Sequence, residues 1–281
     1  MALTKTQSEI WQAMNVGPQW ILRSGADPLV DQELPSEKRS AKGAEPSPIK
    51  TPMPAAVRLE RKPTPTPFTQ PKTEKTVSEL VPNTELQKAA AGASWTELSE
   101  LVSRCKACPI ALTRKHCVFA DGRPGCPIVI VGEAPGRDED IQGIPFVGKS
   151  GQLLTLILDS VGLKRGTDVA IVNVLKCRPP NNRDPLPNEA EACAAFLDRQ
   201  LELLKPEVLI LTGRISINRL LHSDQSIGRL RTSVHSVCLN GRDVPTVVTY
   251  HPSYLLRNPV DKEKSWRDFV TAKRLLRGEK P

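Results

Sequence analysis

Apolar residues follow two alternating patterns through the second two thirds of the chain. Short apolar runs rich in β-branched residues predict buried strands at Pro127–Val131, Val169–Val174 and Val208–Leu211. Apolar residues at helical spacing predict a helix over Gly151–Val161 and another that Asn188 caps and that runs to Leu204. Strands that alternate with helices predict an α/β fold with a mostly parallel sheet covered on both faces.

The C-terminal part of the chain continues the pattern. Two further strands, Val234–Leu239 and Val244–Thr249, are predicted around an Asn240-Gly241 turn. The pattern also predicts a last helix over Glu263–Leu276. Ligands of such sheets bind at the carboxyl ends of the strands. The strand-end loops, where we therefore expect the site, are Gly132–Gly148, Asn173–Pro187 and Tyr250–Arg257.

The first third of the chain has a different pattern. Residues 1–23 contain a capping box, Thr6 to Glu9, and apolar residues that predict a short amphipathic helix. This helix either packs on the main domain or docks on a partner protein, and the sequence favours neither interpretation. Residues 24–93 are rich in Pro, Thr, Ser and Lys, which predicts a largely disordered linker. Order is expected to resume at Ser94, which is predicted to cap the start of a helix, so 94–281 is the predicted catalytic domain.

Composition and charge narrow the class of protein. The 281 residues carry a net charge of +8, which suits a polyanionic partner such as nucleic acid, although many basic proteins bind none. The first apolar cluster is interrupted by Glu9 and Gln12, so neither a signal peptide nor a membrane span is predicted. With seven cysteines and no secretory signal, we expect a reducing, cytoplasmic compartment.

Four cysteines form the strongest chemical signal. Cys105 and Cys108 make a close Cys-x-x-Cys pair, and Cys177 and Cys193 make a looser one. Four thiolates predict a metal site, but the spacing does not separate zinc from a [4Fe–4S] cluster. The remaining cysteines, Cys117, Cys126 and Cys238, are interpreted as packing residues.

Several separated motifs then occur in a fixed order. They are Gly132-Glu133-Ala134-Pro135-Gly136, Glu139-Asp140, Gly143, Pro145-Phe146-Val147-Gly148, Asn173-Val174-Leu175-Lys176-Cys177-Arg178-Pro179-Pro180 and His251-Pro252-Ser253-Tyr254. The region from Trp95 to the final helix resembles the family 4 uracil-DNA glycosylases, the iron–sulfur branch of that superfamily. The resemblance says nothing about residues 1–94.

The resemblance implies a fold and a cofactor. The fold would be an α/β/α sandwich with a four-stranded parallel sheet. The cofactor would be a [4Fe–4S] cluster on Cys105, Cys108, Cys177 and Cys193, with a structural role. The activity would be a monofunctional uracil-DNA glycosylase of base excision repair that acts on uracil-containing DNA as a monomer.

The resemblance also assigns roles to residues of the pocket. Phe146 would stack on a flipped base, Asn173 would read the O4 and N3–H of uracil, and His251 would hydrogen-bond its O2. Glu133 would lie near the attacking water, and Glu139 would shape the pocket near the base. Position 134 is Ala where the best-known branch has a water-activating aspartate, so a dissociative mechanism carried by electrostatics is expected.

DNA contacts are expected from the strand-end loops. Arg178, Arg183 and Arg257 are candidates for phosphate contacts, and Tyr254 and Leu255, with Leu256, are candidates for a wedge in the gap left by the base. Two other classes of function stay open. One is a non-catalytic DNA-binding protein of the same fold, and the other is a zinc-bound interaction module.

Overall fold

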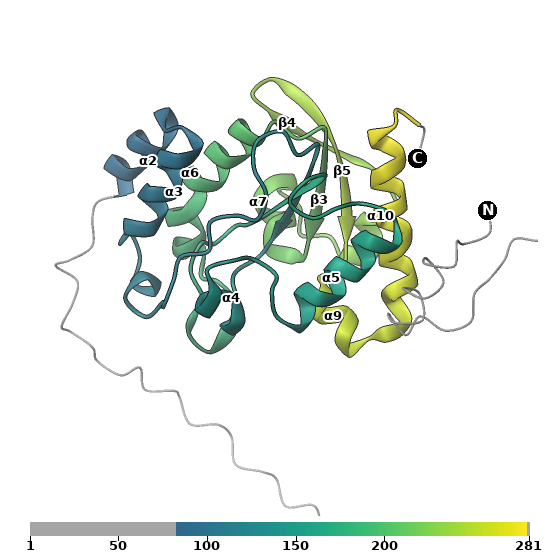
Figure 1. The fold of residues 1–281 in the computed structure, drawn as a ribbon, viewed down its shortest axis with the longest axis horizontal. Coiled ribbons are helices and arrows are strands. Elements are labelled where there is room, and N and C mark those ends of the chain that lie inside the picture. Colours follow the sequence, from purple (N-terminus) through teal and green to yellow (C-terminus); the bar gives the residue numbers. More distant parts are fainter. Residues whose placement is uncertain (1–82, 280–281) are drawn as a thin grey trace, which may run out of the picture. The chain divides into compact units, whose positions relative to one another are not determined.

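The computed structural model describes residues 83–279 (Figure 1). The helices are α2 (Asn83–Gly92), α3 (Trp95–Arg104), α4 (Arg137–Gln142), α5 (Lys149–Ser160), α6 (Pro187–Leu204), α7 (Arg214–Leu221), α8 (Ile227–Leu230), α9 (Pro252–Arg257) and α10 (Lys262–Leu276), with 3₁₀ turns at Pro109–Leu112, Pro180–Asn182 and Pro259–Asp261. The strands are β1 (Ile128–Gly132), β2 (Val169–Asn173), β3 (Val208–Thr212), β4 (His235–Leu239) and β5 (Arg242–Thr249). The predicted helix of residues 1–23 and residues 24–82 of the predicted linker lie outside the described residues.

The five strands form one sheet in the order β2-β1-β3-β5-β4. Strands β2, β1, β3 and β5 are parallel, as the resemblance implied, and β4 adds an antiparallel edge strand. The sheet therefore has five strands rather than four. The extra strand comes from the predicted hairpin, since Asn240 and Gly241 have the positive φ values of 51° and 75° that a tight two-residue turn requires.

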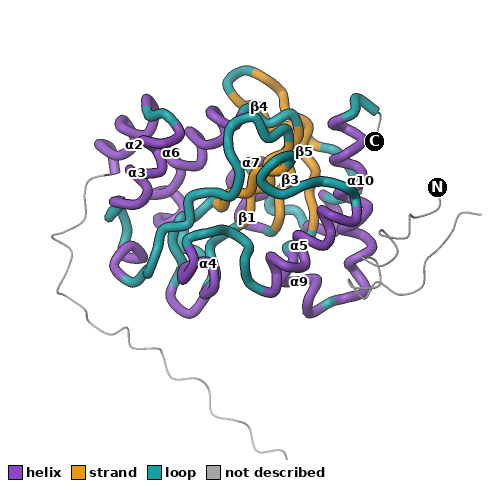
Figure 2. The backbone as a smooth tube through the Cα atoms, in the orientation of Figure 1, coloured by secondary structure: helices purple, strands orange, loops and turns teal. Residues whose placement is uncertain are grey.

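Successive strand residues pack on opposite faces of the sheet and create two core layers. Ile128 and Ile130 of β1 join a cluster with residues of α5 and α10 on one face. Val129 and Val131 join a second cluster with residues of α6 and α7 on the other face. Figure 2 shows the strands between these helices, which confirms the predicted α/β/α sandwich.

The catalytic domain begins earlier than the sequence predicts. Helix α2 occupies residues that were assigned to the linker, so the linker prediction is wrong for residues 83–92. Three successive alanines, 89–91, favour helix, and Ala90 is buried in a small cluster with Leu98 and Val102 of α3 and Phe196 of α6. The cap predicted at Ser94 is present, because Ser94 and Glu97 form a reciprocal capping box.

Three helical boundaries differ from the sequence pattern. The short helices α4 and α9 lie in segments that were predicted as loops. The sequence pattern did not predict them because each is only six residues long and has too little apolar periodicity. Helix α6 begins at Pro187 rather than after a cap at Asn188, and its first turn is held by Glu189, whose carboxylate accepts a hydrogen bond from the Leu186 N–H. No helix within residues 83–279 is long and apolar enough to cross a membrane.

Candidate functional site

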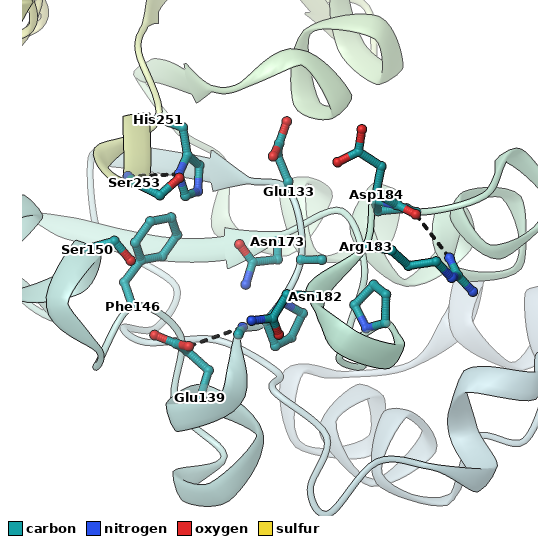
Figure 3. Close-up of a pocket in the computed structure, with 15 residues that line it drawn as sticks. Glu133, Glu139, Phe146, Ser150, Asn173, Asn182, Arg183, Asp184, His251 and Ser253 are labelled. Carbon is teal, nitrogen blue, oxygen red and sulfur yellow. Dashed lines mark hydrogen bonds between the residues drawn. The ribbon is translucent and has the colours of Figure 1, made fainter. Parts of the chain in front are cut away.

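The polar residues singled out in the sequence meet at the carboxyl edge of the sheet. Glu133 follows β1, Asn173 ends β2, and His251 follows β5. They line a cavity of about 240 Å³ together with Glu139 and Phe146 (Figure 3). The structure thus brings together all five predicted catalytic and substrate-binding residues, at the edge where a parallel sheet binds its ligands.

Asn173 lies at the base of this cavity with only 2% of its surface exposed. It pairs with Gly132 across strands β1 and β2, and a Cβ atom at Gly132 would come within 2.3 Å of the Asn173 Oδ1. This Oδ1 is buried and has no hydrogen-bond partner among the described residues. A buried carbonyl oxygen without a partner is costly, so it indicates a place where a ligand donates a hydrogen bond.

Phe146 covers one side of the cavity. Its ring is 5% exposed and lies 5.4 Å from the His251 ring, centroid to centroid. Its backbone φ of 53° is in the left-handed region, which is unusual for a residue with a bulky side chain. In Figure 3 the amide of Asn173 points toward this ring. The pocket therefore presents a flat apolar face beside a polar group, as a planar heterocycle requires.

His251 is fixed by the start of helix α9. Its Nδ1 accepts a hydrogen bond from the Ser253 N–H at 3.1 Å, and the Ser253 hydroxyl lies 2.7 Å away. Because Nδ1 accepts, a neutral ring carries its proton on Nε2. Burial, with a smaller contribution from the nearby Arg257, lowers the pKa of His251 to about 4. The ring is therefore a neutral hydrogen-bond donor at neutral pH.

Glu139 organises the loops around the pocket. Its carboxylate accepts hydrogen bonds from the N–H groups of Gly136 at 3.1 Å and of Val147 and Gly148 at 2.9 Å each. These bonds tie the start of α4 to the loop that carries Phe146. This geometry matches the interpretation of Glu139 as a residue that shapes the pocket.

Glu133 is held at the start of helix α7. Its Oε1 accepts a hydrogen bond from the Ile215 N–H at 3.1 Å, and burial raises the pKa of the carboxyl. In Figure 3 this carboxylate turns away from the Asn173 amide. Glu133 thus lines the pocket on a different side from the residues that face the base site.

The four candidate ligand cysteines are all buried, each between 5% and 7% exposed. Burial raises the pKa of Cys105 and Cys108, and raises that of Cys193 to about 12. Repulsion from Cys177 adds to each of these shifts, so the four sulfurs are electrostatic neighbours. Within residues 83–279, no three Cys, His, Asp or Glu side chains form a group arranged to hold a metal ion.

Two cations accompany these thiols. Arg114 donates from Nη1 to the Cys177 Sγ at 3.0 Å and from Nη2 to the Ser103 carbonyl. Lys176 is 1% exposed and donates to the Asn173 carbonyl, and burial lowers its pKa to about 8. Although these side chains are not grouped around a position for a single ion, four buried soft donors with positive charge beside them have the chemistry that a thiolate-ligated iron–sulfur cluster requires.

The other three cysteines differ from one another. Cys126 is buried away from the four, with its thiol 3.6 Å from the Gly166 carbonyl, as expected for a packing residue. Cys238 lies on edge strand β4 and is exposed, so it does not pack as predicted. Cys117 donates to the Val102 carbonyl at 3.0 Å, and interaction with Cys177 raises the pKa of its thiol, so it is a neighbour of the candidate ligands.

The three predicted DNA-binding arginines all reach the surface but differ in their partners. Arg257 is exposed, and the half-buried Arg178 donates to the Asn182 side chain at 2.6 Å. Arg183 instead makes a bidentate ion pair with the buried Glu189, at 2.8 and 2.5 Å. This pair holds the loop before α6, while the Arg183 side chain stays 38% exposed and lines the cavity, so its phosphate contact stays a prediction.

The predicted wedge is only partly present. Leu255 is 0% exposed and packs against the α5 and α10 side of the core, so its prediction as a DNA-contacting residue is wrong. Helix α9 turns Leu255 inward and leaves Leu256 43% exposed, a difference that a loop prediction could not show. Tyr254 is half-buried, stacks on Tyr250 at 4.9 Å and donates its hydroxyl to Asp261.

Sequence reasoning missed several residues of the site. Ser150, Asn182 and Asp184 also line the cavity, and nothing in their spacing distinguished them from other loop residues. Lys176 was noted only as part of a motif, although it connects the candidate cysteines to Asn173. A lysine next to a predicted ligand and just after a buried strand was the one available signal.

Comparison with known proteins agrees with this geometry. A family model described as the uracil DNA glycosylase superfamily matches residues 119–272. The chain is 42% identical over 180 residues to the type-4 uracil-DNA glycosylase of Archaeoglobus fulgidus, which covers 63% of this chain and 90% of that protein. It is 44% identical over 162 residues to the type-4 uracil-DNA glycosylase of Thermotoga maritima, which covers 57% of this chain and 82% of that protein. A shorter match, 30% over 88 residues, is to the type-5 uracil-DNA glycosylase of Pyrobaculum aerophilum and covers 31% of this chain and 37% of that protein.

Proposed function

The chain belongs to the uracil DNA glycosylase superfamily and, within it, to the type-4 uracil-DNA glycosylases, and we propose that it hydrolyses the N-glycosidic bond of deoxyuridine in DNA. The products are free uracil and an abasic site, as in the first step of base excision repair. The enzyme is monofunctional, and water is the nucleophile. The membership confirms the resemblance predicted from the ordered motifs.

The observation that carries this proposal is the unpaired Asn173 Oδ1 at the base of the pocket. Uracil offers an N3–H donor and an O4 acceptor, which complement the carbonyl and amino groups of one Asn side chain. Cytosine offers an acceptor at N3 and a donor at C4. It would leave buried groups unpaired on both sides, which is a strong basis for rejection.

The chemistry is assigned to electrostatics rather than to a general base. The C1′–N1 bond breaks heterolytically and its electron pair passes to the uracil ring, where much of the charge collects on O2. The Nε2–H of neutral His251 donates to this oxygen and stabilises the departing anion. Water, which Glu133 is assigned to orient, then bonds to C1′ of the oxocarbenium-like sugar. The proton that the water loses passes to solvent, and the uracil anion takes up a proton to leave as neutral uracil.

Access to the pocket requires the nucleotide to leave the helix stack. Phe146 receives the flipped base by stacking, and the pocket shape fixed by Glu139 excludes other orientations. Arg178 and Arg257 are assigned to phosphates, and the exposed Leu256 takes the wedge role that Leu255 cannot fill.

Cys105, Cys108, Cys177 and Cys193 are proposed to hold a [4Fe–4S] cluster. When bound, the cluster would supply a covalent link between the end of α3, the 177–187 loop and α6, with no redox step in hydrolysis. Purified protein should then be brown, whereas a zinc protein would be colourless. No disulfide bond joins any of the seven cysteines, which all lie within the described residues, and the proposal includes a reducing, cytoplasmic compartment.

The N-terminal segment is proposed to recruit a protein partner. Residues 1–23 would dock on that partner through their apolar residues, and the linker would act as a tether that raises local concentration. The catalytic domain would act as a monomer.

The test is a single-turnover assay with a DNA oligonucleotide that carries one uracil, followed by alkaline cleavage at the abasic site. Matched oligonucleotides with cytosine or thymine at the same position serve as controls. Cleavage confined to the uracil position is expected. A folded, cofactor-loaded protein that leaves the uracil strand intact would contradict the proposal.

A further inference from the structure

The loop that carries Phe146 poses a structural problem, because this residue adopts a left-handed conformation with φ at 53°. Residues with bulky side chains leave that region unless their surroundings hold them there. Helix α5 approaches so closely that a Cβ atom at Gly151 would lie 1.8 Å from the Phe146 carbonyl oxygen, so only glycine fits there. The position of the Phe146 ring therefore depends on what holds its backbone.

One side chain meets this backbone directly. Arg165, in the segment between α5 and β2, donates from Nη1 to the Phe146 carbonyl oxygen at 2.6 Å and from Nη2 to the Pro145 carbonyl oxygen. Nη1 also lies 3.3 Å from the Thr155 hydroxyl of α5. A planar guanidinium donates to two successive carbonyls from a rigid fork of N–H groups, a fixed geometry that the ammonium of lysine lacks.

Arg165 is itself oriented from the opposite side. Its Nε donates to the Asp121 carboxylate, and the two side chains are only 18% and 26% exposed. The backbone of Asp121 is fixed in turn, because its N–H and carbonyl both pair with Ile171 at the free edge of β2. A chain of contacts therefore runs from the sheet through Asp121 and Arg165 to Phe146.

We propose that Arg165 is a positioning residue for uracil excision, which holds Phe146 in the conformation that stacks on the flipped base. The inference rests on the proposed function and deepens it. Arg165 does not line the pocket, so its effect on excision has to pass through the Phe146 loop.

The decisive experiment is a double-mutant cycle measured by single-turnover uracil excision. Arg165→Lys keeps the positive charge beside Asp121 but removes the paired guanidinium N–H donors. We expect it to slow excision about 10-fold in the wild-type background. In a Phe146→Ala background, which is slow already, the same change should cost less than about 2-fold, because the ring it positions is gone. An equal fractional loss in both backgrounds, or no loss in the wild-type background, would overturn the proposal.

Arg199→Lys is the matched control. Arg199 is also mostly buried, at 17% exposed, and donates to the Ala93 carbonyl and the Glu202 carboxylate, far along the chain from the pocket loops. It should lower thermal stability to a similar degree and leave excision unchanged. If Arg199→Lys slowed excision as much as Arg165→Lys, the effect would be one of general stability and the proposal would fail.

A second measurement separates this inference from the proposed function. The chain has five phenylalanines, so fluorine-labelled phenylalanine gives a simple NMR spectrum in which Phe146→Ala identifies the Phe146 signal. Arg165→Lys should shift or broaden that signal, and Arg199→Lys should leave it in place. An unmoved signal in Arg165→Lys would refute the positioning role whether or not the protein excises uracil.

Discussion

The base pocket and the four-cysteine region are both buried, but different interactions organise them. In the pocket, backbone hydrogen bonds fix the groups that surround the base site, as with Glu139 and its N–H donors or His251 and Ser253. Around the cysteines, the sulfurs are held by packing, the pKa values of three of the four thiols are raised, and the half-buried Arg114 and the buried Lys176 supply positive charge.

This contrast indicates what each region contributes. The pocket obtains its geometry from the polypeptide itself, so a change there should alter chemistry more than folding. The cysteine region brings together four thiols whose deprotonation and ligation to a bound cofactor would stabilise the fold. A change there should therefore alter folding more than chemistry. Lys176 joins the two, since it lies beside the cysteines and donates to the Asn173 carbonyl.

The largest expected effect is therefore loss of a candidate ligand. Cys105→Ser, Cys177→Ser or Cys193→Ser should give colourless, poorly folded protein, as judged by absorbance near 400 nm, iron content and thermal unfolding. Cys126→Ser is the matched control, because Cys126 is equally buried but lies apart from the four. Bleaching of Cys126→Ser to the same degree would show that the ligand assignment is wrong.

Cys117 sharpens the same test. Its thiol interacts electrostatically with Cys177 but donates to the Val102 carbonyl, and it is not one of the assigned ligands. Cys117→Ser should therefore retain the colour and the iron content of the wild type. Complete loss of iron on this change would move Cys117 into the ligand set and remove one of the assigned four.

The next largest effect is expected at Asn173. Asn173→Asp keeps the size of the side chain but replaces the amide donor with a second acceptor, so uracil excision should fall by about 1000-fold. The protein should stay folded and brown, because the pocket does not depend on the amide for its structure. Uracil excision at the wild-type rate would exclude Asn173 as the base-reading group.

His251 should have a smaller effect and a distinctive pH dependence. His251→Gln should slow excision by about 100-fold with little change in DNA binding, since its contact strengthens as charge develops. Because the pKa of the imidazole is lowered from 6.5 to about 4, the wild-type rate should show no loss from this group between pH 8 and 5. A rate that fell with a midpoint near pH 6.5, absent in His251→Gln, would contradict a neutral donor.

The same shift affects stability. The folded state binds this proton less readily than the unfolded state, so the contribution of His251 to stability is complete above about pH 6.5 and is lost as the pH falls toward 4. Wild-type protein should thus lose more thermal stability than His251→Gln between pH 7 and 5. Parallel pH profiles of the two proteins would argue against a buried, neutral imidazole.

The smallest effect is expected from removing residues 1–82, which leaves helix α2 intact. The truncated protein should be brown, folded and within about twofold of the full chain in single-turnover excision, because no assigned residue precedes Cys105. A large loss of chemical rate would mean that the N-terminal segment completes the site.

Local signals predicted the fold, whereas the pocket residues were predicted through the family resemblance that the ordered motifs carry. The strand runs, the Ser94 cap and the Asn240-Gly241 turn act over a few residues. What escaped prediction depends on long-range packing. The burial of Leu255 and the Arg165 contact with the Phe146 loop are set by neighbours that only the folded chain brings together.

The most direct test of the central claim is a crystal structure of the protein with its product, free uracil. Our account predicts a uracil ring stacked on Phe146, with its N3 within about 2.9 Å of the Asn173 Oδ1 and its O2 facing the His251 Nε2. Uracil bound elsewhere, or in the pocket with N3 turned away from Asn173, would contradict it.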